Sequence, residues 1–341
     1  MLVRLPNWIG DIVMATPLLA ALRAHWPDAH VAVAGPAHAR PILEGLASID
    51  AVHALPKRSD GGARGILSAA ALLRAETFDL GVLLTNSFSS ALVLALAGVP
   101  ERVGYGGGGR GVLLTRSLPV PRQRGRHRLP VPMVQHYARL LDELCVPRGS
   151  HRTQLATTPA DDEHAEAWLA RHDLLEHGPL FGIHPGSSFG PSKLWYPERF
   201  SELADRLHRR HGGRTVVFCG PPEHELARAI AAGASSPVFA AAEDPIGLDV
   251  LKAVIRRLTL LISTDTGPRH FAAPFDVPCV ALMGSTDPRF TNTNLARSLV
   301  VRTEVACSPC QLKVCPIDHR CMTRLSVDQV AAAAEQLLAA S

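Results

Sequence analysis

Short apolar runs alternate with longer helical patterns along most of the chain. In the first half, three runs of strand length are apolar at nearly every position, as in the strands of a parallel sheet covered on both faces. These runs are Leu2–Leu5, His30–Ala34 and Leu80–Leu84. Stretches rich in Ala and Leu lie between and after them, and these residues favour helix. The predicted helices are Ile12–His25, Ala69–Ala75, Ser89–Ala97 and Met133–Glu143.

A polar stretch rich in turn residues, Val146–Pro159, interrupts this alternation and predicts a domain boundary. Beyond it the alternation resumes. The predicted strands are Leu180–His184, Thr215–Cys219, Leu258–Ser263 and Cys279–Met283. The predicted helices are Glu198–His211, Glu223–Ala231, Leu248–Arg256 and Val327–Ala339.

Two halves of alternating strands and helices predict an α/β fold with two Rossmann-like domains, each built on a parallel sheet. The domains are expected at residues 1–155 and 156–325, followed by a C-terminal helix over residues 326–341. Ligands of such sheets bind at the carboxyl ends of the strands. The turns that follow the strands are therefore where binding residues are expected.

The composition is that of an ordinary folded protein. Of 341 residues, 47% are apolar and 19% are charged, which excludes a disordered chain. The net charge of +4 is too small to indicate a nucleic-acid binder, and aromatic residues, at 5%, are too scarce for a base-stacking surface. The longest uncharged apolar run, Ala91–Ala97, is far shorter than the roughly 20 residues that cross a bilayer. A strand at the very start replaces any signal peptide, so a soluble, cytoplasmic protein is expected.

Four of the seven cysteines lie close together late in the chain: Cys307, Cys310, Cys315 and Cys321, with His319 among them. Thiolates at short spacing can hold a tetrahedral zinc ion. Only the first pair has the usual two-residue gap, so plain thiols or a disulfide are the alternative. The other three stand singly in apolar surroundings, where buried thiols are expected: Cys145, Cys219 and Cys279.

The turn after the first predicted strand runs from Asn7 to Asp11. Its Gly10 permits a tight turn in which the backbone can approach a ligand closely. Asp11 then stands at the head of the predicted helix. Its carboxylate either caps free backbone N–H groups there or faces the contents of a binding site.

Two turns in the second half carry polar residues that suit an anion. Ser187, Ser188 and Lys193 could cradle and neutralise a phosphate, although the turn matches no Walker loop or dinucleotide fingerprint. A plain surface loop is the alternative. The other turn leads into a predicted helix whose first turn contains Pro268. Four polar or small residues lie before and within this helix: Asp265, Thr266, Gly267 and His270. Its alternative is a capped helix with a structural histidine.

Seven arginines surround the glycine run Gly106–Gly109, and only Glu101 opposes them. They are Arg102, Arg110, Arg116, Arg122, Arg124, Arg126 and Arg128. The glycines favour a mobile, solvated loop. The charge instead indicates a landing site for phosphate or carboxylate groups on an acidic acceptor.

Taken together, the motifs resemble the lipopolysaccharide heptosyltransferases of glycosyltransferase family 9, most of all the heptosyltransferase II branch. The resemblance is carried by Asn7–Asp11, Gly186–Trp195, Thr264–His270, Gly284–Pro288 and the cysteine segment. It covers roughly the whole chain. Each motif is moderately specific, and their shared order and spacing are highly specific.

The resemblance implies the GT-B architecture, in which two Rossmann-like domains face a cleft. The N-terminal domain takes the acceptor and the C-terminal domain takes the nucleotide sugar. Family members transfer heptose from ADP-L-glycero-β-D-manno-heptose to the lipopolysaccharide inner core, with inversion and with neither a metal nor a cofactor. The implied partners are that donor and the core acceptor at the inner membrane surface, with no nucleic acid and no transmembrane segment. The implied location is cytoplasmic and peripheral to the inner membrane.

By the same resemblance Asp11 is the catalytic base, and Asn7 and Gly10 belong to the substrate site beside it. The donor side comprises the phosphate contacts Ser187, Ser188 and Lys193 and the pocket residues Asp265, Thr266, Gly267 and His270. One departure from the family pattern is Pro274, which predicts a shortened or kinked helix after Gly267.

Three other functions fit the same features. A GT-B glycosyltransferase with another nucleotide sugar would differ in the donor that it hydrolyses. A sugar-nucleotide epimerase of GT-B type would convert its donor without any acceptor. A non-catalytic binding module, organised by zinc at the four cysteines, would contain the metal on elemental analysis.

Overall fold

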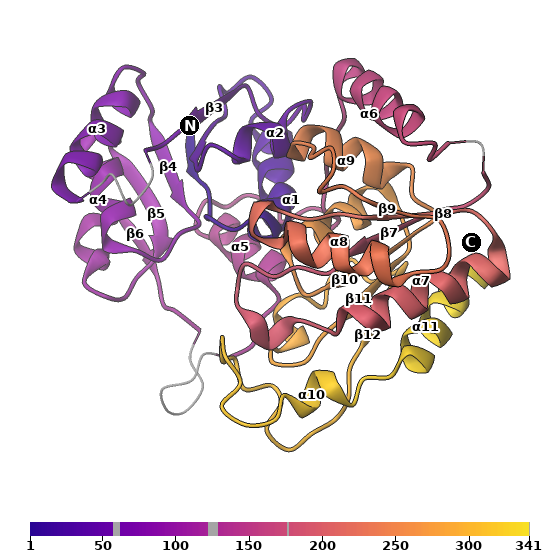
Figure 1. The fold of residues 1–341 in the computed structure, drawn as a ribbon. Helices are drawn as coiled ribbons and strands as arrows, with labels where there is room; N and C mark the ends of the chain where they lie inside the picture. The colour runs from indigo at the N-terminus through magenta and orange to yellow at the C-terminus, as the bar shows by residue number, and fades with distance from the viewer. Residues whose placement is uncertain (57–61, 122–128, 176, 341) are drawn as a thin grey trace. The chain divides into compact units, whose positions relative to one another are not determined.

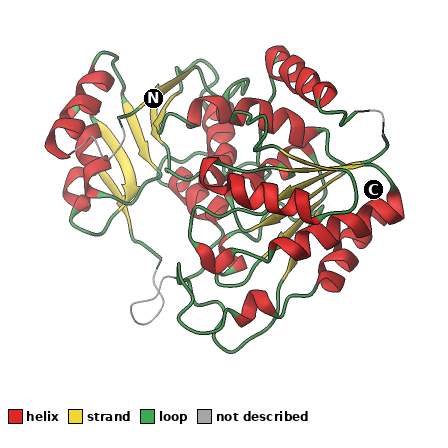
Figure 2. Ribbon diagram, in the orientation of Figure 1, coloured by secondary structure: helices red, strands yellow, loops and turns green. Residues whose placement is uncertain are grey.

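The computed structural model describes residues 1–56, 62–121, 129–175 and 177–340. They form two compact units, Met1–Ala156 and Thr157–Ser341, and each contains one six-stranded parallel sheet (Figure 1). Helices flank the sheet of each unit (Figure 2). The predicted α/β fold with two Rossmann-like parallel sheets is confirmed.

The sheet of the first unit has the strand order β3-β2-β1-β4-β5-β6. Its strands are β1 (Leu2–Arg4), β2 (Ala32–Gly35), β3 (Ala51–Ala54), β4 (Leu80–Leu83), β5 (Glu101–Tyr105) and β6 (Arg116–Leu118). Its helices are α1 (Ile9–His25), α2 (Ala39–Leu43), α3 (Gly62–Arg74), α4 (Phe88–Leu96) and α5 (Met133–Asp142), with the 3-10 helix η2 (Arg110–Leu113). The direction of winding reverses between β1 and β4, and such a switch point is where open α/β sheets bind ligands.

The second unit repeats this topology with the order β12-β11-β10-β7-β8-β9. Its strands are β7 (Leu180–His184), β8 (Arg214–Val217), β9 (Val238–Ala240), β10 (Leu260–Thr264), β11 (Cys279–Leu282) and β12 (Ser298–Val301). Its α-helices are α6 (Pro159–Arg171), α7 (Pro197–His211), α8 (His224–Gly233), α9 (Leu248–Arg256), α10 (Arg320–Thr323) and α11 (Val327–Ala339). Its switch point lies between β7 and β10.

Each sheet is anchored by apolar side chains on the strands that pack against the covering helices. In the first unit, Leu2 and Leu83 pack in one cluster with Leu73 of α3 and Leu94 of α4. In the second unit, strand and helix residues such as Phe181, Phe200, Leu207 and Val330 form the equivalent cluster, and all are almost completely buried. Each such side chain stabilises the fold by about 1.5–3 kcal/mol, so the sheet edges that carry the turns are held rigidly.

The α-helix predicted after the strand Leu258–Ser263 is absent from the second unit. Two 3-10 helices take its place, η5 (Gly267–Phe271) and η6 (Ala273–Phe275). Pro274 explains the difference, because in the interior of an α-helix it lacks the N–H group for the backbone hydrogen bond and its ring clashes with the preceding turn. Pro268 lies in the first turn, where a helix tolerates proline. The shortening that Pro274 predicts is therefore more complete than expected.

The isolated cysteines differ from the prediction of three buried thiols. Only Cys279 is buried, Cys219 is partly buried, and Cys145 is exposed. Cys145 follows the end of α5 with a left-handed backbone (φ 55°). Among the described residues, no helix combines the length and apolar character needed to cross a membrane.

Candidate functional site

The switch point of the second unit brings two of the predicted turns together. The turn after β7 leads through Gly186 to the short 3-10 helix η3 (Pro191–Lys193), and the turn after β10 contains Asp265 and Thr266. Because β7 and β10 are paired neighbours, both turns leave the same edge of the sheet. Residues separated by about seventy positions in the chain thus meet at one point.

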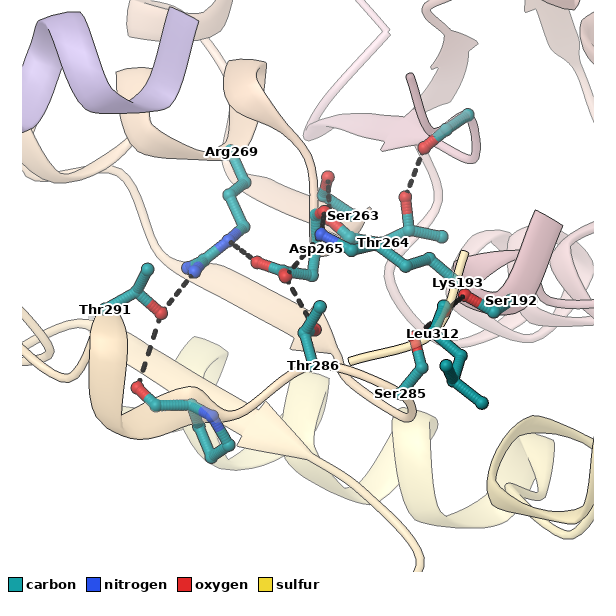
Figure 3. Close-up of polar contacts among 12 residues, drawn as sticks. Ser192, Lys193, Ser263, Thr264, Asp265, Arg269, Ser285, Thr286, Thr291 and Leu312 are labelled. Atoms are coloured by element: carbon teal, nitrogen blue, oxygen red, sulfur yellow. Dashed lines mark hydrogen bonds and ion pairs between the residues drawn. The ribbon is translucent and has the colours of Figure 1, made fainter. Parts of the chain in front are cut away.

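Asp265 is the centre of this cluster (Figure 3). Lys193 Nζ donates to Asp265 Oδ2 and to its backbone oxygen, both at 2.7 Å. Arg269 Nε donates to Asp265 Oδ1 at 3.0 Å, and the Thr286 hydroxyl donates to Oδ2 at 2.7 Å. The side chains of Asp265, Lys193 and Arg269 are only 11%, 10% and 6% exposed. One carboxylate therefore holds two nearly buried cations, and the cluster carries a net positive charge.

The surroundings of Asp265 fix its ionisation. Burial disfavours the carboxylate, but the charges of Arg269 and Lys193 together outweigh it and hold the pKa of Asp265 well below its usual range. His270 shows the opposite balance. Burial, reinforced by the charge of Arg269, lowers the pKa of His270 well below its usual value. His270 is thus neutral at pH 7 and can both donate and accept a hydrogen bond.

Lys193 already has partners within the protein, which bears on its predicted contact with the donor phosphates. Its ammonium group donates two hydrogen bonds to Asp265, and it also lies over the Phe189 ring, 4.8 Å from the centroid. An ammonium group has three donors, so one N–H remains for a ligand. The pairing positions Lys193 and leaves its charge in place.

A second set of contacts fixes the backbone around the cluster. Ser192 Oγ lies 3.0 Å from Ser285 Oγ and donates to the Leu312 carbonyl at 2.5 Å (Figure 3). Gly190 has a φ of 148°, and a Cβ there would lie 2.5 Å from the Lys313 carbonyl oxygen. Only glycine permits this close approach. The segment that contains the four late cysteines therefore packs directly on the Lys193 turn.

Two further polar groups lie at this edge. Ser187 Oγ is buried and has no hydrogen-bond partner among the described residues. Glu223, which the sequence patterns did not indicate, lies after β8 and accepts a hydrogen bond from Gly220 N at 2.9 Å. Its carboxylate lies where a Cβ on Gly186 would be, within 2.2 Å of that position. Ser188 is exposed, whereas Thr266, Gly267 and His270 are partly buried.

The first unit presents Asp11 differently from the prediction. Helix α1 begins at Ile9 with Trp8 as its N-cap, so Gly10 and Asp11 lie within its first turn. Gly10 is therefore a helical residue and makes no tight turn, and Asp11 is not the N-cap. The Asp11 carboxylate is close enough to Tyr137 of α5 that it adds to the effect of burial, which raises the pKa of that phenol well above its usual value. Asn7 is exposed just before the helix.

Of the seven arginines around the glycine run, the structure describes three, and each of these donates to carbonyl groups of the protein. Arg110 is buried and donates to five acceptors, among them the carbonyl groups of Tyr105, Gly106 and Gly107. Arg102 donates to three carbonyl groups, and Arg116 bonds Glu143 O and pairs with Glu101. For these three, the structure shows guanidinium groups with partners in the protein, so the prediction of a mobile, solvated loop is wrong here. The landing site for an acidic acceptor stays a prediction. Arg122, Arg124, Arg126 and Arg128 lie outside the described residues.

The four late cysteines are free thiols. Burial, with a smaller contribution from the neighbouring cysteines, raises the pKa of Cys321. In the part of the chain that the structure describes, no three side chains among His, Cys, Asp and Glu are grouped so that they could hold a metal ion.

The Asp265 cluster predicts a large effect on stability. Asp265→Asn should lower the free energy of unfolding by about 3–5 kcal/mol near neutral pH, because Lys193 and Arg269 would stay buried without their carboxylate. The pKa of Asp265 is lower in the folded protein than in the unfolded chain. The stabilisation is therefore fully present above the pKa of the unfolded chain, and it is lost as the pH falls through the pKa of Asp265 in the folded protein. The difference in the free energy of unfolding between wild type and Asp265→Asn, measured with urea, should therefore become smaller in acid, below about pH 4.

The matched control for this prediction is Glu202→Gln, which removes an exposed ion pair with Arg206 on α7. Such a pair is screened by water and should contribute far less. An Asp265→Asn protein as stable as the Glu202→Gln protein would show that the cluster does not support the fold.

Comparisons with known proteins agree over most of the chain. The model of glycosyltransferase family 9 (heptosyltransferase) matches residues 66–320. Lipopolysaccharide heptosyltransferase 2 of Salmonella typhimurium is 31% identical over 307 residues, which are 87% of this chain and 86% of that protein. The solved structure of Escherichia coli ADP-heptose lps heptosyltransferase II superimposes with a TM-score of 0.79 at 26% identity, over 99% of this chain and 98% of that one. A family 9 glycosyl transferase from Veillonella parvula has the same fold, with a TM-score of 0.85 at 24% identity over 100% of this chain and 97% of that one.

Proposed function

The chain belongs to glycosyltransferase family 9, and from that premise we propose that it transfers heptose from ADP-L-glycero-β-D-manno-heptose to the lipopolysaccharide inner core. The transfer inverts the anomeric configuration and uses no metal. The cationic cluster at the switch point of the second unit is the observation that carries this proposal. It combines a net positive charge with the Ser187 hydroxyl, which has no partner among the residues that the structure describes, at the edge where nucleotides bind in such folds.

The donor is assigned to the second unit. Its diphosphate binds at Ser187, Ser188 and the remaining N–H of Lys193. Glu223 follows the second strand of its sheet, the place from which an acidic residue binds the ribose in many doubly wound folds. Its carboxylate therefore receives the ribose hydroxyl groups. Thr266, Gly267 and neutral His270 line the sugar side of the pocket.

The acceptor is assigned to the first unit, with Asp11 as the catalytic base and Asn7 and Gly10 beside it. The acceptor hydroxyl oxygen attacks the anomeric carbon, and the bond from that carbon to the phosphate oxygen breaks. ADP leaves with the electron pair, and Asp11 takes the proton. The cluster around Lys193 stabilises the charge that develops on the departing diphosphate.

One feature of Asp11 bears on the timing of this step. Its place in the first turn of α1 favours the carboxylate form, which makes it a weak base. A transition state with oxocarbenium character needs proton transfer only late, after much of the bond to ADP has broken. A weak base is then sufficient.

The proposal sets the partners and the place of action. The partners are ADP-heptose and a lipopolysaccharide core acceptor, which is presented at the cytoplasmic surface of the inner membrane. The enzyme is cytoplasmic and peripheral to that membrane.

Transfer should survive exhaustive chelation with EDTA. Lys193 and Arg269 supply positive charge at the departing diphosphate, the task that a divalent cation performs in other transferases. The measurement is the transfer rate after chelation, with and without added Mg²⁺, beside a thermal melt of the same samples. A rate that collapses while the melting temperature is unchanged, and that returns with Mg²⁺, would overturn the metal-free mechanism.

A panel of nucleotide sugars separates this function from its nearest alternative, a GT-B enzyme with another donor. ADP-heptose should be the donor that is hydrolysed slowly without acceptor and consumed rapidly with it. Faster turnover of a uridine or guanosine donor would favour the alternative.

A further inference from the structure

Arg4 is the last residue of β1, at the switch point of the first unit, and its guanidinium group pairs with no carboxylate of the described residues. It donates to Leu5 O at 2.5 Å and to Ala34 O at 3.3 Å through Nη1. In the part of the chain that the structure describes, its Nη2 donates only to Asn7 Oδ1, at 3.5 Å. Within the described residues, Nε has no acceptor and no carboxylate lies within ion-pair distance. Burial lowers the pKa of Arg4 to about 10, which shows the cost of holding this charge out of water.

Other arginines of the same unit show what a purely structural guanidinium looks like here. In Arg110, all three nitrogens are bonded, at distances of 2.5–3.1 Å. In Arg102, Nε bonds Leu113 O at 2.6 Å, and Nη1 bonds Val99 O at 2.5 Å. Arg4 differs because the outer side of its fork, Nε and Nη2, is left for another acceptor. Two N–H groups of a guanidinium fit a carboxylate or phosphate side by side.

Two neighbours of Arg4 at this edge, Thr85 and Asn7, also have polar groups that a ligand could contact. β4 pairs with β1 so that Leu83 lies opposite Arg4, and Thr85 follows two residues later. Thr85 Oγ1 is buried and has no partner among the described residues. On the other side, His38 Nε2 lies 3.0 Å from Asn7 O, so Asn7 is fixed between His38 and Arg4. Asn7 leads into α1, whose N-terminus has no side-chain cap.

We propose that Arg4, Asn7 and Thr85 form a subsite that binds an oxyanion of the acceptor, a carboxylate or a phosphate, at the switch point of the first unit. This inference rests on the proposed function, because it supplies the acceptor with a point of attachment beside the Asp11 helix. The bound anion would receive two N–H bonds from Arg4 and one hydrogen bond from the Thr85 hydroxyl. It would thereby compensate the buried charge of Arg4, for which the described residues supply no carboxylate.

The test compares Arg4→Gln and Arg4→Lys with the matched control Arg102→Gln, which removes a carbonyl-bonded arginine from the amino end of β5. Each protein is assayed with a truncated lipopolysaccharide core, with the same core after reduction of its carboxyl groups, and with the core after removal of its phosphates. Arg4→Gln should raise the KM for the intact core about tenfold or more, because a hydrogen-bonded charge pair is lost. Its kcat and its KM for the donor should stay near wild type. The KM of Arg4→Lys for the intact core should lie between those of wild type and Arg4→Gln. Arg102→Gln should not change the acceptor KM.

The treated cores identify the anion. Whichever treatment abolishes the difference between wild type and Arg4→Gln names the bound group. An Arg4→Gln protein with the wild-type acceptor KM, or one whose KM rises equally for every core, would reduce Arg4 to a structural role. Calorimetric binding of the core without donor keeps the two proposals apart. If the core binds in an Arg4-dependent way but no heptose is transferred, the proposed function is refuted and the subsite stands. If heptose is transferred but binding of the core does not depend on Arg4, the subsite is refuted and the proposed function stands.

Discussion

Asp11→Asn should reduce heptose transfer by about 10²-fold or more, the loss expected when a general base is removed. The variant keeps the size and shape of the side chain, but it loses the negative charge and the ability to take a proton. Donor binding should stay near wild type, since the donor site is assigned to residues of the other unit. The measurement is the transfer rate under saturating substrates, beside calorimetric titration with ADP.

A carboxylate in the first turn of a helix can also have a purely structural role, because its negative charge interacts favourably with the helix dipole and stabilises the helix. Asp328 occupies the same kind of position in α11, and Asp328→Asn is the matched control. It should perturb folding as a lost first-turn carboxylate does and leave transfer unchanged. If Asp11→Asn transferred heptose as fast as Asp328→Asn, Asp11 would be only a stabilising residue of α1.

Lys193→Ala should weaken ADP binding and slow transfer together, each by about tenfold or more, since hydrogen bonds to charged groups contribute about 1.5–3 kcal/mol. The same ammonium group meets the bound diphosphate and the departing one. Lys193→Arg should recover part of both losses, because it keeps the charge but changes the geometry around Asp265. Calorimetry with ADP and the transfer rate measure the two effects separately.

Loss of Lys193 also breaks a buried ion pair, so a control for stability is needed. Lys252 is fully buried in the same unit, and its Nζ lies 3.3 Å from Asp161 Oδ2. Lys252→Ala should lower the melting temperature and leave ADP affinity unchanged per folded molecule. Equal affinity for ADP in wild type and Lys193→Ala would remove Lys193 from the donor site.

Elements whose pattern is strong were predicted closely from the sequence. β7 and α11 have the predicted bounds, and α11 also begins with a Ser326–Gln329 capping box. Weakly patterned strands were missed. β5, Glu101–Tyr105, begins with the charged pair Glu101 and Arg102 and contains Gly104, so no continuous apolar run marks it. Helix α1 starts three residues before the predicted Ile12, because Trp8 carries no polar side chain that would mark the N-cap.

The site was predictable where a turn follows a strong strand, and less so where partners meet in space. Lys193 and Asp265 each follow a strand with a clear apolar run, so both turns were identified, but their ion pair depends on the pairing of β7 with β10. Glu223 and Arg4 gave no local signal at all. Each acquires its significance only from the edge of the sheet at which it lies.

The charge pattern around Gly106–Gly109 misled for a related reason. Arginines beside a glycine run look solvated, but a guanidinium can bind several carbonyl groups that turn toward one point, as Arg110 does. Nothing in the order of the residues distinguishes such an anchor from a free cation.

The most direct test of the central claim is to incubate the purified protein with ADP-heptose and a truncated lipopolysaccharide core and to weigh the core by mass spectrometry. The account predicts that the core gains one heptose, that ADP is released in equal amount, and that the new linkage has the inverted anomeric configuration. A core of unchanged mass, or one that gains a sugar only from another nucleotide donor, would contradict it.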